Sequence, residues 1–178
     1  MLFVKEYSFR GNHAERVLRL TTHLGNDKEI KIFDRNVDVY IIAPLIGFLY
    51  GRKAELDKSN AETKIFPEQL SNEQTTLQYN YRLIMLLDKK HEASFEERVN
   101  KAFRYYGNEG EQTILDEQLF EQYVRGGVDV LYEKLIENAI TTEEYLKNLY
   151  DFLDEFDARY NDAVHTDSIL ELCRIAKK

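Results

Sequence analysis

The sequence has few of the residues that define several protein classes. Its 178 residues include one cysteine, two prolines, eight glycines and no tryptophan. A lone cysteine cannot form an internal disulfide or supply the cysteine set of a structural zinc site. So few prolines and glycines exclude collagen-like and linker-like chains, and they disfavour turn-dense all-β folds. The thiol of Cys173 is typical of a reducing compartment.

Export signals and membrane-spanning runs are also missing. Four residues precede the first charge at Lys5, too few for the apolar core of a secretory signal. The longest apolar run, 37–50, is interrupted by Asp38, Pro44 and Gly47. As a helix it would be about 21 Å long, against about 30 Å for the hydrocarbon core of a bilayer. We therefore expect a cytoplasmic protein that contacts no membrane.

The composition is typical of one globular domain whose charge is unevenly distributed. Apolar residues make up 43% and charged residues 31% of the chain, which is ordinary for a soluble domain. Residues 1–64 hold 11 Lys and Arg against 9 Asp and Glu, whereas residues 65–178 hold 13 against 23. The net charge of −8 disfavours a protein that is basic throughout. An electrostatic contact with an anion should therefore involve the N-terminal third.

Helix caps and apolar periodicity predict helices along most of the chain. Gly126 and Gly127 predict a stop between two of them, and Pro44 predicts a kink, or a break after Ala43. The predicted helical segments are 12–24, 35–51, 71–90, 94–107, 111–125, 128–138, 141–160 and a last one from 167.

The exceptions to this helical pattern lie near the N-terminus. Residues 2–7 and 29–33 alternate and can pair as a minor β-ribbon, while 52–67 is typical of a long connection. The predicted fold is all-α: a single domain over 1–178, a bundle of six to eight helices around 35–51, with room for a minor N-terminal β-ribbon.

The first candidate site is a basic arc on the helix 12–24. At about 100° per residue, four basic side chains fall within roughly 120°, opposite the apolar face. Arginine can contact phosphates, and histidine adds positive charge at lower pH. Cations elsewhere in the N-terminal third would extend the arc into a nucleic-acid-binding surface; the alternative is the solvated face of an amphipathic helix. The residues of this candidate surface are His13, Arg16, Arg19, His23, Arg35, Arg52 and Lys53.

Enzyme signals are weak. Asp38 lies in an apolar segment and needs a cationic partner, for which Arg35 is suitably placed. The less favoured interpretation is a metal-dependent hydrolase built from Asp38, Glu55 and Asp57. The sequence contains no phosphate loop, no Gly-x-Ser-x-Gly and no histidine pair at helical spacing. It therefore predicts no metal ligand set and no cofactor.

Two features favour a role in protein interaction. Asp151, Asp154, Glu155 and Asp157 form an acidic cluster whose negative potential can attract a basic partner protein. Twelve tyrosines and ten phenylalanines exceed what a small helical core usually requires, and exposed tyrosine is favoured at interfaces. The alternative for these aromatics is packing at the boundary of the core.

The leading hypothesis is a non-enzymatic helical interaction or adaptor subunit of a larger cytoplasmic assembly, with a protein partner or a second copy of itself. The alternative is a nucleic-acid-binding accessory protein that uses the basic N-terminal arc.

Overall fold

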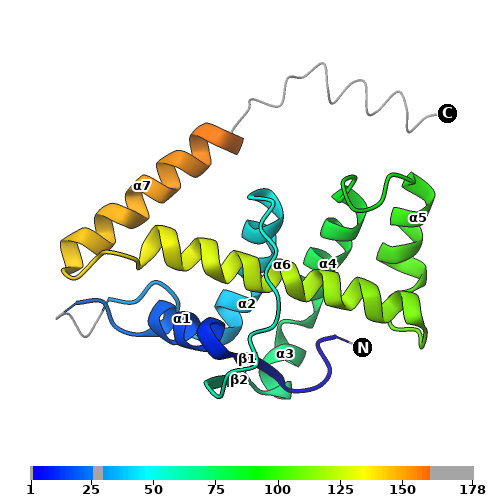
Figure 1. The fold of residues 1–178 in the computed structure, drawn as a ribbon, viewed down its shortest axis with the longest axis horizontal. Helices are drawn as coiled ribbons and strands as arrows, with labels where there is room; N and C mark the ends of the chain where they lie inside the picture. The colour runs from blue at the N-terminus through cyan, green and yellow to red at the C-terminus, as the bar shows by residue number, and fades with distance from the viewer. Residues whose placement is uncertain (1, 26–29, 161–178) are drawn as a thin grey trace.

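The fold is organised around a long central helix, α6 (Glu111–Leu135), and the helix that crosses it, α2 (Asn36–Leu49). The computed structural model describes residues 2–25 and 30–160. Helices α2 and α6 make the most extensive contact between described elements, and α1 (Gly11–Thr21) packs against α6 beside α2. Figure 1 shows α6 running the length of the molecule beneath the diverging α7.

The other elements surround this pair, and the prediction of a mainly helical single domain with a small β-ribbon is confirmed. Among the described helices, none is long and apolar enough to cross a membrane. The remaining elements are β1 (Tyr7–Arg10), β2 (Glu62–Ile65), α3 (Pro67–Asn72), α4 (Gln74–Leu87), α5 (Phe95–Val99), the π-helical turn η1 (Asn100–Arg104) and α7 (Thr142–Tyr160).

The β-ribbon is formed by different segments from the predicted ones. β1 pairs antiparallel with β2, in a register that sets Tyr7 opposite Ile65, whereas the prediction paired residues 2–7 with 29–33. Residues 62–65 alternate only briefly and are mostly polar, so in the sequence they resemble the rest of the long connection 52–67. Asn36 stabilises β2 from the start of α2, because its amide donates to the hydroxyl of Thr63 and the carbonyl of Lys64 at 3.0 and 3.2 Å.

The prediction that Gly126 and Gly127 separate two helices is wrong, because α6 continues through both. A Cβ at Gly127 would overlap the carbonyl oxygen of Ala43 in α2, and one at Gly47 would overlap the carbonyl oxygen of Tyr123 in α6. The glycines therefore let two helix backbones touch. Glycine costs about 1 kcal/mol relative to alanine inside a helix, and the close packing of α2 against α6 offsets that cost.

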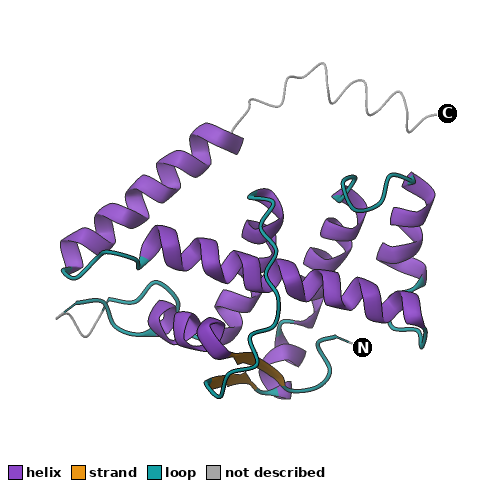
Figure 2. Ribbon diagram, viewed as in Figure 1, coloured by secondary structure: helices purple, strands orange, loops and turns teal. Residues whose placement is uncertain are grey.

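Residues 51–61, which we call the strap, cross α6 on the way from α2 to β2 (Figure 2). The backbone N–H of Ala54 donates to the carbonyl of Gln122 at 3.1 Å, and Arg125 Nε donates to the carbonyl of Ala54 at 2.9 Å. A Cβ at Gly126 would overlap the carbonyl of Arg52. The lack of a side chain at Gly126 therefore allows the strap to pack against α6, just as the lack of one at Gly127 allows α2 to do so.

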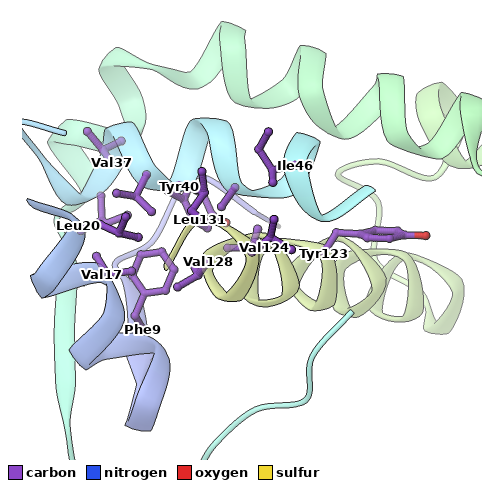
Figure 3. Close-up of a cluster of buried hydrophobic side chains, with 14 of the residues drawn as sticks. Phe9, Val17, Leu20, Val37, Tyr40, Ile46, Tyr123, Val124, Val128 and Leu131 are labelled. Carbon is purple, nitrogen blue, oxygen red and sulfur yellow. The ribbon is translucent and has the colours of Figure 1, made fainter. Parts of the chain in front are cut away.

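The core lies between α1, α2 and α6. Figure 3 shows Val17 and Leu20 of α1 facing Val37 and Tyr40 of α2, with side chains of α6 alongside. Tyr40 is fully buried, and its ring packs edge-on against Phe9 with the centroids 6.0 Å apart. Much of the aromatic content is therefore core. The other rings of this cluster are Phe3, Tyr7, Tyr81, Tyr106 and Phe120.

Cap predictions had mixed outcomes. Ser94 accepts from the backbone N–H of Glu97 at 3.3 Å, and Thr141 accepts from that of Glu144 at 3.3 Å, as their spacing predicted. Helix α2 starts after Arg35, and it does not break after Ala43, since Pro44 lies inside it. The predicted helix from residue 167 lies outside the described residues.

The helix crossing predicts that Gly127→Ala destabilises the protein strongly, because the added methyl group meets backbone instead of a movable side chain. Overpacking of this kind costs about 3 kcal/mol or more, and urea unfolding monitored by circular dichroism measures it. The matched control is Gly110→Ala: Gly110 has extended backbone and an added Cβ would meet nothing within 4 Å. Equal stability losses in the two variants would contradict the assigned close approach.

Candidate functional site

The basic arc of α1 does not form one exposed face. His13 is only 3% exposed, on the side of α1 that packs against α6, whereas Arg19 and His23 are exposed. The Nε2 of His13 lies 3.2 Å from Oδ1 of Asp129 in α6, and Arg16 donates to the same oxygen. The guanidinium of Arg16 also lies 5.3 Å from the centroid of the Tyr132 ring. Two of the four arc residues therefore bind α6.

Asp129 is the carboxylate on which this contact between α1 and α6 depends. Burial by itself would raise its pKa, but the adjacent His13 and Arg16 outweigh burial and hold the pKa below its ordinary value of 3.8. Asp129 is therefore a largely buried carboxylate that lies beside the His13 imidazole and the Arg16 guanidinium. Such pairs specify how two elements meet, and removing one partner is strongly destabilising.

Arg35 and Asp38 form the ion pair expected for a carboxylate in an apolar segment. Arg35 Nη2 lies 2.6 Å from Oδ1 of Asp38 and 3.1 Å from Oε1 of Glu73. The same Asp38 carboxylate accepts from the backbone N–H of Arg35 at 2.9 Å, which satisfies the start of α2. Both residues thus have structural contacts.

Arg52 and Lys53 begin the strap and make different contacts. Arg52 Nη2 lies 3.0 Å from Oε1 of Glu133 in α6. Lys53 instead lies over the ring of Tyr123, with its ammonium 5.4 Å from the centroid. The structure therefore brings His13, Arg16 and Arg52 to acidic positions of α6, and it leaves Lys53 without a described carboxylate partner.

The carboxylates of the hydrolase hypothesis also have separate structural contacts. Glu55 accepts from the Gln122 amide at 2.9 Å. Asp57 accepts from the backbone N–H of Asn12 at 2.9 Å, and this bond and a second one from Ser59 lower its pKa. Within residues 2–25 and 30–160, no group of three or more His, Cys, Asp or Glu side chains is arranged to hold a metal ion.

Helix α7 carries an exposed apolar stripe, which we define as Leu146, Tyr150 and Leu153. Their spacing of i, i+4 and i+7 places them on one face, and they are 46%, 70% and 56% exposed. A second apolar face of α7 is packed, because Tyr145 and Phe152 are buried. The ring of Phe152 stacks on that of Tyr50 with the centroids 6.5 Å apart. The apolar surface of α7 is thus wider than the part its own chain covers.

Acidic side chains border the α7 stripe. Glu143, Asp151 and Asp154 are exposed. Of the predicted acidic cluster, Glu155 is engaged: Lys134 Nζ donates to it at 2.6 Å, and the hydroxyl of Tyr50 donates to it at 3.3 Å. The bond from Lys134 is the main cause of its lowered pKa. The cluster therefore divides into a carboxylate that holds α7 to the body and others that face solvent.

The apolar residues of 141–160 are so numerous that they form one broad face in the sequence, in which this stripe is not distinguished from the packed residues. The signal was present in the spacing of Leu146, Tyr150 and Leu153. The tyrosine surplus gave a partial indication: Tyr79 and Tyr150 are 65% and 70% exposed, whereas Tyr40 and Tyr81 are buried.

Comparisons with protein-family models, curated proteins and solved structures find no match for this chain.

The Asp129 contact predicts a pH-dependent loss of stability in Asp129→Asn. Because the folded-state pKa is lowered, the carboxylate contributes stability above pH 3.8 that is lost as the pH falls through the folded-state pKa. At pH 7 we expect a loss of about 3 kcal/mol, narrowing toward zero as wild-type Asp129 becomes protonated. Urea unfolding from pH 7 down to about pH 3 measures this trend.

The control is Asp154→Asn, at an exposed position of α7, for which we expect a change within about 0.5 kcal/mol. A loss in Asp129→Asn that is the same at every pH would show that the charge is not its source.

Proposed function

We propose that this protein is a non-enzymatic interaction subunit that binds a partner protein through the α7 stripe. The observation that carries the proposal is the exposure of Leu146, Tyr150 and Leu153 along one face of a helix whose adjoining apolar face is already packed. Spacing of i, i+4 and i+7 is the pattern by which helices present anchors to a partner.

The energetics favour a covered stripe. Burying apolar surface contributes about 25 cal/mol per Å², so covering a leucine or tyrosine side chain is worth on the order of 1.5–3 kcal/mol. Helix α7 is also held to the body near Tyr50 and Lys134. A partner can therefore dock on a helix that is already formed, and little ordering entropy opposes binding.

The charge beside the stripe defines the partner's chemistry. Glu143, Asp151 and Asp154 are exposed on α7. A partner segment with apolar anchors would complement the stripe, and Lys or Arg beside those anchors would complement the three carboxylates. A second copy of α7 packed antiparallel would instead bring the acidic edges to the same side, where they repel. The favoured occupant is therefore a basic amphipathic segment of a different protein.

The stripe predicts that Leu146→Ser combined with Leu153→Ser weakens partner binding without unfolding the protein. We would immobilise the full chain, recover bound proteins from cells that make it, and remeasure each with purified components. Loss of two interface anchors should weaken the interaction at least about tenfold. Unfolding curves should stay within about 0.5 kcal/mol of wild type, since both side chains are exposed.

The matched control is Ile114→Ser on α6, because Ile114 is 56% exposed, as is Leu153. A second variant, Glu143→Gln with Asp154→Asn, should slow association and reduce its salt dependence. Partners that bind all these variants equally would refute the proposal, as would a partner whose contact surface is acidic.

A further inference from the structure

Two adjoining hollows lie on either side of Lys53. The first has a volume of about 370 Å³, and polar and apolar side chains line it in equal measure: Lys53, His91, Glu92, Lys101, three glutamines, Leu115 and Leu119. The second has a volume of about 320 Å³ and is lined by Phe48, Leu49 and Leu87 together with other residues. The other lining residues of the second hollow are Gly51, Asp88, Lys89, Lys90 and Tyr123.

The two hollows share a wall that hydrogen bonds hold in place. The ammonium of Lys53, in the first hollow, lies 5.4 Å from the ring centroid of Tyr123, which lines the second. The hydroxyl of Tyr123 donates to Asp88 at 2.7 Å, and Asp88 in turn accepts from the backbone N–H of His91 at 3.1 Å. The two hollows are therefore neighbours, separated by these side chains.

The first hollow contains a buried cation. Lys101 lies in the π-helical turn η1, and its side chain is only 7% exposed. Its ammonium is 3.2 Å from Oδ1 of Asp116, which also accepts from Gln112 at 2.8 Å, and 4.0 Å from Glu92. An ammonium has three N–H donors, so Lys101 retains donors beyond the one that Asp116 takes. π-Helical turns are found frequently at functional sites.

The rim of the hollows adds lysines that no described carboxylate neutralises. Lys53, Lys89 and Lys90 are exposed, and none forms an ion pair with a described residue. The exposed imidazole of His91 also lines the first hollow. The three lysines contrast with Arg16, Arg35 and Arg52, which all pair with carboxylates. In a protein of net charge −8, such a group of free cations around a hollow is a site for an anion.

We infer that the two hollows form one binding site for a phosphate monoester with an apolar body. The phosphate group binds to Lys53, His91 and Lys101, which line the first hollow together with Glu92, the carboxylate 4.0 Å from the Lys101 ammonium. The apolar body lies against Phe48, Leu49 and Leu87. This site is separate from the α7 stripe and does not depend on the proposed interaction function.

The same phosphate chemistry has two sources, a free phosphorylated metabolite and the phosphates of a nucleic acid. The volumes favour the metabolite, because each hollow has room for a small group. Three probes distinguish the sources when titrated by calorimetry at low salt: phenyl phosphate, inorganic phosphate and a single-stranded oligonucleotide. We expect phenyl phosphate to bind at least about tenfold more tightly than inorganic phosphate, because only the aryl ester fills the apolar hollow.

Surface variants test the two hollows separately. Lys53→Gln combined with His91→Gln should weaken phenyl phosphate at least about tenfold, with no effect on folding because both side chains are exposed. Leu87→Ser should remove the preference for phenyl phosphate and leave binding of inorganic phosphate unchanged. The matched control is Lys58→Gln, an exposed lysine of the strap that lines neither hollow.

Three results would overturn the inference. The first is no binding of phenyl phosphate at millimolar concentration, and the second is equal weakening by Lys58→Gln. The third is an oligonucleotide that binds more tightly than phenyl phosphate and whose binding is lost in Lys53→Gln with His91→Gln, since it would assign these cations to a nucleic acid.

Discussion

The backbone contact between α2 and α6 at Gly47 and Gly127 is the constraint on which the rest of the structure depends. Two helices that touch through backbone have almost no freedom to slide, because neither has a side chain there that can adjust. The strap leaves the end of α2 at this crossing and passes over α6 at Gly126. One pair of adjacent glycines therefore sets the position of α2 and the path of the following segment.

This crossing also determines where the charges of the N-terminal third lie. Once α1 and the strap pack on α6, Arg16 and Arg52 reach Asp129 and Glu133, which are one helical turn apart. The basic excess of residues 1–64 and the acidic excess of residues 65–178 then partly neutralise each other within the fold. An uneven distribution of charge along a sequence need not imply an anionic partner, because the complementary charges can belong to the same chain.

Much of the fold could be predicted because helix periodicity and caps are local. The capping by Ser94 and Thr141 and the helical content follow from residues three or four positions apart. The roles of Gly126 and Gly127 could not be predicted. A glycine that ends a helix and a glycine that allows another backbone to pack closely are the same residue type in the sequence. His13 and Arg16 were likewise predicted to be exposed from their angular positions on α1. An angular position does not show which neighbouring helix covers a side chain.

The candidate sites were harder to predict because each depends on segments far apart in the chain. Lys53 and Lys101 line one hollow because the strap crosses α6 at Gln122 and Lys101 of η1 pairs with Asp116 of the same helix. The spacing of the α7 stripe, unlike the two hollows, is local in the sequence. The sequence does not show which apolar face of α7 the rest of the protein covers. Tyr50 and Lys134 decide this by engaging Glu155 and Phe152. They turn one face of α7 inward, and the face that carries Leu146, Tyr150 and Leu153 is thereby directed to solvent.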